Sequence, residues 1–198
     1  MKTIDYYFWI NSDWAYLGAD RLEALAVRNQ ASIAYKPVDL LAVYARTGGI
    51  PLGERAVERQ AYRQQELKRW SDRLGIAINV TPRYMCPNGD LASCLTIAAD
   101  HNGLEVAGLY KAILHAQWCD DLDVSDPEVL LNIANDLEYP GEQLLTLART
   151  EAIKKIYADY TEEAIAAGVF GSPTYCYRGQ VFWGQDRLDF LEEAVARD

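Results

Sequence analysis

The chain has 198 residues, of which 50% are hydrophobic and 24% are charged, with 13 Gly and 7 Pro. This composition excludes a disordered chain or a low-complexity fibre, and the length fits one domain, or one domain that carries an insertion. The formal net charge of −10 disfavours partners that are themselves anionic, so we expect no binding to nucleic acid or to anionic lipid.

Neither a membrane span nor an export signal is found in the sequence. No apolar run approaches the roughly 18 residues that span a bilayer, and the N-terminus lacks the apolar stretch and cleavage site of a signal peptide. We therefore expect a cytoplasmic protein without a membrane partner. The cysteines form no C-x-x-C pair, which argues against a disulfide framework, a zinc ribbon or a redox dithiol; they are Cys86, Cys94, Cys119 and Cys176.

The first forty residues have the pattern of a β-α-β unit. Ile4–Ile10 is β-branched and aromatic and predicts a strand, and apolar residues at helical spacing from Trp14 to Ala26 predict a helix. Ser32–Val38 predicts a second strand, which a right-handed crossover would place parallel to the first. A ligand is then expected beyond the C-terminal end of the first strand.

The rest of the chain is helical and then returns to strands. Between Glu54 and Ala167, helical periodicity with Gly, Pro and Asn breaks predicts five or six helices. Thr174–Tyr177 and Gln180–Trp183 predict a hairpin, and a last helix is expected over Asp186–Ala196. This order predicts an α/β fold: a thioredoxin-like domain, 1–45 and 168–198, with a large all-helical insertion, 46–167.

Three positions combine a local structural role with possible chemistry. Ser12 lies between the first strand and the first helix, where it is either the N-cap or a hydroxyl facing an anion at the positive end of the helix dipole. One residue can do both. Ser172-Pro173 precedes a strand, and a cis bond there would turn backbone groups outward to a ligand. Asp186 has the pattern of an N-cap of the last helix.

Two further patterns have an ordinary explanation beside a functional one. His115 and Cys119 are four residues apart, which is metal-ligand spacing, but two ligands do not make a site and packing roles are favoured. Arg55, Arg59 and Arg63 recur at every fourth residue of a predicted helix. They form either a solvated basic face or a rim that attracts an anionic substrate.

Together these segments resemble the 2-hydroxychromene-2-carboxylate isomerase family, which is similar to kappa-class glutathione transferases and has a DsbA-like thioredoxin fold. The resemblance covers nearly the whole chain. Its carriers are the segments 8–17, 67–76 and 116–118, and above all VFGSPT at 169–174 with FWGQDRL at 182–188.

The resemblance implies glutathione as the cofactor. It places Ser12 against the glutathione sulfur, in the position of the first cysteine of the oxidoreductases, with Ala15 in the position of the second. A hydroxyl donor and a helix N-terminus would then stabilise the thiolate. It also implies that glutathione binds to residues of the two C-terminal motifs, which are Ser172, Pro173, Trp183, Gln185 and Asp186.

For the substrate, the resemblance implies a pocket lined by Tyr84, Arg55 and Tyr44, in which Arg55 would bind a carboxylate with two hydrogen bonds. This chain departs from the family at Asp13, where the family has Pro, and at Tyr44, where it has Lys. A third departure is Glu54, where the family has Asn.

The implied activity is a glutathione-dependent isomerase of aromatic degradation that acts on a small molecule, an aromatic carboxylate. The alternatives are a kappa-like glutathione transferase and a non-catalytic glutathione-binding module. A homodimer is implied by the family.

Overall fold

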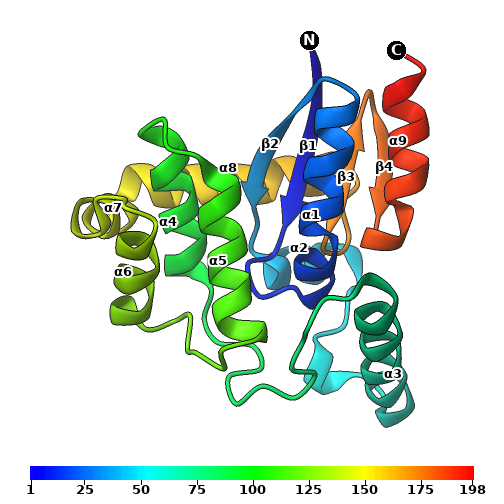
Figure 1. Cartoon of the computed structure of the whole chain (residues 1–198), viewed down its shortest axis with the longest axis horizontal. Helices are drawn as coiled ribbons and strands as arrows, with labels where there is room; N and C mark the ends of the chain where they lie inside the picture. The colour runs from blue at the N-terminus through cyan, green and yellow to red at the C-terminus, as the bar shows by residue number, and fades with distance from the viewer.

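A computed structural model describes residues 1–198, and its centre is a four-stranded sheet (Figure 1). The strands are β1 (Lys2–Phe8), β2 (Ala31–Pro37), β3 (Thr174–Tyr177) and β4 (Gln180–Trp183). Their order is β2-β1-β3-β4, with β2 parallel to β1 and the C-terminal hairpin antiparallel to it. The crossover between β1 and β2 is α1 (Asp13–Arg28). The predicted β-α-β start and the predicted hairpin are therefore confirmed.

Alternate residues of β1 face two apolar layers. Ile4, Tyr6 and Phe8 belong to the larger core, whereas Tyr7 packs in a smaller core on the opposite face. Tyr6 stacks on Tyr175 of the neighbouring strand with ring centroids 5.2 Å apart. This period-two alternation between two buried faces fixes the register of the strand.

Helices cover both faces of the sheet. The larger core includes residues of α1 and of α9 (Leu188–Ala196), which lies beside the C-terminal hairpin in Figure 1. The smaller core includes residues of α2 (Leu40–Thr47) and α8 (Glu151–Ala166). The long α8 passes behind the sheet in Figure 1.

The segment between α2 and β3 contains the predicted helices. They are α3 (Val57–Leu74), α4 (Asp90–His101), α5 (Val106–Trp118), α6 (Pro127–Asp136), α7 (Gly141–Ala148) and α8. Residues of α4 and α5 belong to the same buried cluster as β1, so the insertion shares its core with the sheet. In contrast, α3 stands apart at the edge of the molecule and buries only Leu67 (Figure 1). No helix is both long enough and apolar enough to cross a membrane.

Three local predictions differ from the structure. β1 ends at Phe8, because Trp9 to Ser12 forms a turn in which the N–H of Ser12 donates to the carbonyl of Trp9 at 3.0 Å. Arg55 precedes α3, after the short helix η1 (Leu52–Glu54), so the three arginines do not share a helix face. Asp186 is not an N-cap, because a 3₁₀ turn, η2 (Gln185–Arg187), contains it before α9 begins.

Candidate active site

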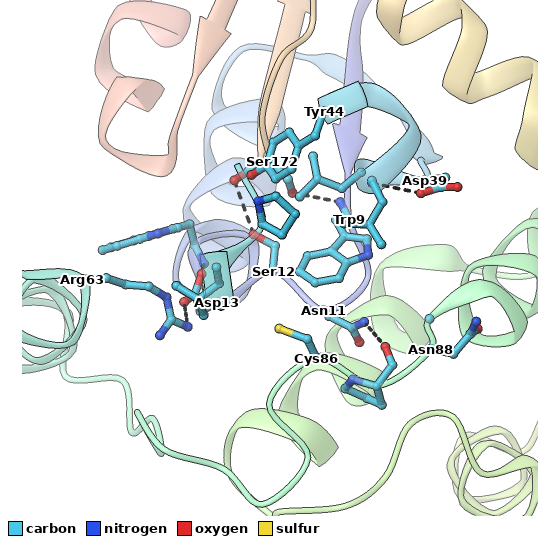
Figure 2. Close-up of a pocket in the computed structure, with 18 of the residues that line it drawn as sticks. Trp9, Asn11, Ser12, Asp13, Asp39, Tyr44, Arg63, Cys86, Asn88 and Ser172 are labelled. Carbon is cyan, nitrogen blue, oxygen red and sulfur yellow. Dashed lines mark hydrogen bonds and ion pairs between the residues drawn. The ribbon is translucent and has the colours of Figure 1, made fainter. Parts of the chain in front are cut away.

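The main cavity opens at the C-terminal end of β1, which is where the β-α-β order predicted a ligand. Its volume is about 420 Å³, a size suited to a small molecule. The β1–α1 turn supplies Ser12 and Asp13, and the segments before and within α3 supply Arg55 and Arg63. Ser172 enters from the turn before β3, so elements far apart in the sequence meet here (Figure 2).

Ser12 is the N-cap of α1 and also lines the main cavity. Its Oγ accepts a hydrogen bond from the N–H of Ala15 at 3.2 Å, and its hydroxyl donates to the carbonyl of Ser172 at 3.4 Å. The N–H of Asp13, at the first turn of the helix, has no acceptor within the protein. The N-cap interpretation of Ser12 is therefore confirmed, and its hydroxyl lies at the positive end of the helix dipole in the cavity lining.

Ser172 connects the C-terminal hairpin to the β1–α1 turn. The Ser172–Pro173 peptide bond is cis, as the motif suggested. The Oγ of Ser172 accepts from the N–H of Trp9 at 2.8 Å, while its own backbone N–H has no acceptor in the protein. A free N–H beside Ser12 is suited to a ligand carbonyl.

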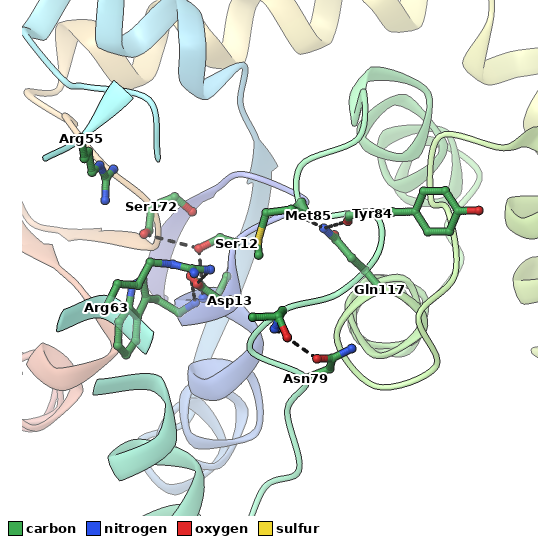
Figure 3. Close-up of polar contacts among 12 residues, drawn as sticks. Ser12, Asp13, Arg55, Arg63, Asn79, Tyr84, Met85, Gln117 and Ser172 are labelled. Carbon is green, nitrogen blue, oxygen red and sulfur yellow. Dashed lines mark hydrogen bonds and ion pairs between the residues drawn. The ribbon is translucent and has the colours of Figure 1, made fainter. Parts of the chain in front are cut away.

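A buried ion pair joins α1 to α3 at the edge of the main cavity. Arg63 Nη2 contacts Asp13 Oδ2, and the two side chains are only 11% and 8% exposed (Figure 3). Asp13 Oδ1 also accepts from the N–H of Trp14 at 2.7 Å. Burial raises the pKa of Asp13 above its ordinary value, and the Arg63 guanidinium opposes that rise. Removal of one partner from such a buried pair destabilises the fold by about 3–5 kcal/mol.

Arg55 and Tyr44 form the other side of this cavity. Arg55 Nε donates to the carbonyl of Ile50 at 2.8 Å, and its Nη2 donates to the Tyr44 hydroxyl at 3.2 Å. Burial raises the pKa of Tyr44, and Arg55 opposes the rise. Tyr44 is therefore a neutral hydroxyl that helps to orient the guanidinium.

Two buried polar atoms of residues that line the main cavity lack both a hydrogen-bond partner and an ion-pair partner. They are Asn11 Oδ1 and Trp118 Nε1. The amide nitrogen of Asn11 donates to the carbonyl of Pro87 at 2.7 Å, so only its oxygen is free. Unsatisfied buried polar groups are uncommon and cost about 1–3 kcal/mol each, and they are often associated with binding sites.

A side cavity of about 430 Å³ adjoins the main one and shares Trp14, Tyr44, Arg55 and Ser172 with it. Its other wall runs from the end of β4 into η2 and includes Trp183, Gln185 and Asp186. The side chain of Asp186 is 42% exposed and lies 3.4 Å from Arg187 Nη2. An accessible carboxylate next to a cationic side chain can bind both ends of an amino-acid group.

Gln185 is buried and oriented by α1. Its amide oxygen accepts from Arg21 Nη1 at 2.8 Å, which leaves the amide NH₂ without a protein acceptor. Gly18 makes this contact possible, because a Cβ there would lie 2.8 Å from the Cβ of Gln185. Gly184 has a φ of +102°, a region that favours glycine, and so turns the chain into the Gln185–Arg187 segment.

The structure brings together nearly all of the residues that the sequence singled out. The main cavity is lined by Ser12, Ser172, Tyr44 and Arg55. The side cavity is lined by Trp183, Gln185 and Asp186. Pro173 is buried and lines neither cavity. Tyr84 also lines neither cavity, and its side chain points away from Ser12 in Figure 3. Only the backbone carbonyl of Tyr84 is engaged, by Gln117 Nε2 at 3.2 Å.

Sequence reasoning missed three residues of the main cavity. Cys86, to which the sequence analysis assigned no role in the site, lines the cavity opposite Ser12 (Figure 2). Partial burial raises the pKa of this thiol. Asp13 and Arg63 were noted separately, as a family departure and as part of a basic face, but not as partners. In the sequence, only the opposite charges of the two residues could have indicated this ion pair.

The helical His115–Cys119 pair has other partners. His115 Nδ1 lies 3.0 Å from Asp120 Oδ2, and Cys119 Sγ lies 3.0 Å from the Tyr16 hydroxyl and 3.2 Å from the carbonyl of Ala77. These contacts agree with the packing roles that the sequence favoured.

Comparison with known proteins gives the same fold and related sequences. A 2-hydroxychromene-2-carboxylate isomerase of Sphingobium xenophagum is 29% identical over 192 residues, which cover 96% of each chain. The protein of that name from Pseudomonas putida is 25% identical over 197 residues, or 98% of this chain and 94% of the relative. A solved structure of a 2-hydroxychromene-2-carboxylate isomerase superposes with a TM-score of 0.84 at 26% identity, over 98% of this chain and 95% of the other.

These relatives support an isomerase activity for this chain at moderate identity. The family model for the DSBA-like thioredoxin domain matches residues 3–196, nearly the whole chain. The four-stranded sheet with its helical insertion is the corresponding architecture. The chain therefore belongs to the DSBA-like thioredoxin family.

Proposed function

We propose that this protein is a glutathione-dependent isomerase that acts on 2-hydroxychromene-2-carboxylate or a related aromatic carboxylate. The relatives' names supply the isomerase class. The observation that carries the proposal is the position of Ser12, whose hydroxyl and helix N-terminus face a cavity in place of a redox cysteine.

The side chains present fit glutathione in both cavities. Asp186 is accessible and suits an ammonium group, and the neighbouring Arg187 suits a carboxylate. The free N–H of Ser172 lies where the two cavities meet and suits a backbone carbonyl of the tripeptide. When bound, glutathione supplies a thiol nucleophile that adds reversibly to a conjugated double bond and thereby permits rotation.

The role of Ser12 is to stabilise negative charge on sulfur. A free thiol has a pKa of about 8.5, so at neutral pH it needs a hydrogen-bond donor or a positive electrostatic potential to ionise. The Ser12 hydroxyl, whose contact with the Ser172 carbonyl is long at 3.4 Å, and the free N–H of Asp13 supply the donors, and the dipole of α1 supplies the potential. These groups are fixed by the fold before any ligand arrives, which is the arrangement that lowers a barrier.

The test is isomerisation with a thiol-free control. The full-length protein is incubated with 2-hydroxychromene-2-carboxylate and glutathione, and the product is identified by chromatography and mass spectrometry. We expect an isomer of unchanged mass that forms with glutathione and not with S-methylglutathione. Turnover that is independent of the thiol would contradict the proposal, and a retained glutathione adduct would indicate a transferase instead.

A further inference from the structure

The guanidinium of Arg63 has unused hydrogen-bond donors inside the main cavity. Its Nη2 contacts Asp13, and its side chain is only 11% exposed. The remaining N–H groups have no acceptor in the protein, although Arg63 lines the cavity. A guanidinium has five N–H donors, and those of Arg63 that do not contact Asp13 remain available to a ligand in the cavity. Arg63 is therefore arranged to accept a second anion on the side that faces the cavity.

Arg55 is more fully engaged than Arg63. Two of its nitrogens already donate to the Ile50 carbonyl and the Tyr44 hydroxyl, at 2.8 and 3.2 Å. It still contributes positive charge to the same part of the cavity, because Figure 3 shows Arg55 and Arg63 on the same side of Ser12. The role that the family resemblance gave to Arg55 is thus better suited to Arg63.

The main cavity is polarised from one end to the other. Two arginines and one aspartate, Asp13, lie at the α3 end, so this end carries a net positive charge. The other acids of the lining are Asp39 and Asp90. Figure 2 shows Asp39 far from Arg63, and Asp90 accepts a hydrogen bond at 3.2 Å from Asn88, which Figure 2 also shows far from Arg63. Asp39 is occupied as the cap of α2, where it accepts from the N–H groups of Leu41 and Ala42.

A buried aromatic ring supports the guanidinium from behind. The Arg63 guanidinium carbon lies 5.8 Å from the centre of the Trp118 ring, which is 1% exposed. Trp118 Nε1 is one of the two unpartnered buried atoms in the cavity lining. A cation held on one side by Asp13 and supported by Trp118 has little freedom to leave the cavity.

We infer that Arg63, positioned by Asp13, binds the carboxylate of a planar, conjugated substrate in the main cavity. The inference rests on the proposed function, since that function supplies the reaction for which the carboxylate must be oriented. Arg63 is the substrate-binding group, and Asp13 is a positioning residue. Asp13 stands where the resembled family has Pro, so this ion pair distinguishes the present chain.

The experiment compares an acid with its uncharged amide. Chromone-2-carboxylate and chromone-2-carboxamide are flat, unreactive probes, and their dissociation constants are measured by calorimetry with and without glutathione. We expect the parent protein to bind the acid at least tenfold more tightly than the amide. Arg63→Gln should weaken acid binding by about 10- to 100-fold, as for loss of a charge-assisted hydrogen bond, and leave amide binding unchanged. Arg59→Gln, on the exposed face of the same helix, is the matched control.

A second variant keeps the test valid if Arg63→Gln leaves Asp13 unpaired and unfolds the protein. Asp13→Asn/Arg63→Gln removes both charges and should also abolish the preference for the acid. Asp13→Asn alone should reduce that preference, and Asp13→Glu, which restores a carboxylate, should recover it. An undiminished preference in the double variant, or an equal loss in Arg59→Gln, would overturn the inference.

Glutathione binding separates this inference from the proposed function. If the parent binds no glutathione but prefers the acid, and the Arg63→Gln variant lacks that preference, the proposed function fails and the carboxylate site stands. If the parent and Arg63→Gln both bind glutathione and bind the acid equally well, the carboxylate site fails and the proposed function stands.

Discussion

The main cavity and the side cavity hold their polar groups in different ways. Ser12 and Asp13 in the main cavity are 5% and 6% exposed, and both are fixed by hydrogen bonds within the protein. In the side cavity, Trp183 is 51% exposed and the Asp186 side chain is 42% exposed. The polar groups named in the main cavity are buried and preorganised, and those named in the side cavity are accessible to solvent.

This difference assigns distinct roles to the two cavities. Enclosed, fixed donors act most strongly on charge that develops during a reaction, because they need no reorganisation and are little screened. Exposed charges act on binding, where water competes with them. Substitution of Ser12 in the main cavity should therefore change the rate at saturating glutathione, and substitutions in the side cavity should change the affinity for glutathione.

The largest effect is expected from Ser12→Ala. Loss of one preorganised donor should lower turnover at saturating glutathione by about 10²- to 10³-fold, while the affinity for glutathione changes little. Ser125→Ala, which lies outside both cavities, serves as the control. Steady-state kinetics and calorimetry give the two quantities. An unchanged rate would remove Ser12 from the chemistry and leave it as a helix cap.

Asp186→Ala should change the affinity for glutathione much more than the rate at saturating glutathione. Loss of a charge-assisted contact should weaken glutathione binding by about 10- to 100-fold and affect the saturated rate much less. Glu193→Ala removes the same charge from the exposed face of α9 without touching either cavity. The measurement is the dissociation constant by calorimetry. Equal constants for Asp186→Ala and the parent would show that the side cavity does not bind the amino-acid end of glutathione.

Cys86 offers a chemical readout of occupancy in the main cavity. It is exposed, whereas Cys94 and Cys176 are buried and have pKa values raised to about 11 by that burial. At pH 8, iodoacetamide should therefore modify Cys86 well before the two buried thiols. S-methylglutathione at ten times its dissociation constant should slow the modification of Cys86 about tenfold, since only the free form reacts. Peptide mapping by mass spectrometry gives the rates, and the absence of protection would place the ligand elsewhere.

The fold was largely predictable because its signals are local. The β-branched run of β1, the apolar spacing of α1 and the Arg178-Gly179 turn each depend on neighbours in the sequence. The error at the end of β1 came from Trp9 and Ile10, whose side chains favour a strand but lie in a turn. Tertiary contacts decided that boundary, since Trp9 donates its N–H to Ser172.

The site was predictable only where a short motif carries it. Trp183, Gln185 and Asp186 lie within one segment, and the turn that holds Ser12 is also local. Asp13 and Arg63 are 50 residues apart in the sequence, and no local pattern pairs them. Tyr84 lies outside both cavities because a family position predicts where the backbone passes, whereas packing decides which way the side chain points.

The smallest predicted effect tests how the buried part of the side cavity is supported. Arg21 holds Gln185 through its amide oxygen at 2.8 Å and its backbone carbonyl at 3.1 Å. Arg21→Gln should free the Gln185 side chain and weaken glutathione binding by about two- to tenfold, the usual size for one hydrogen bond of modest net energy.

Arg28→Gln is the matched control for this change. It removes the same charge from the same helix, but Arg28 pairs with Glu192 on the surface, away from both cavities. Calorimetry with glutathione and a melting curve for each variant separate a binding effect from a loss of stability. Because the expected change is small, equal weakening by Arg21→Gln and Arg28→Gln would indicate long-range attraction between glutathione and the positive charge of α1. Weakening by Arg21→Gln alone would show that even the open cavity depends on one preorganised contact beneath its surface.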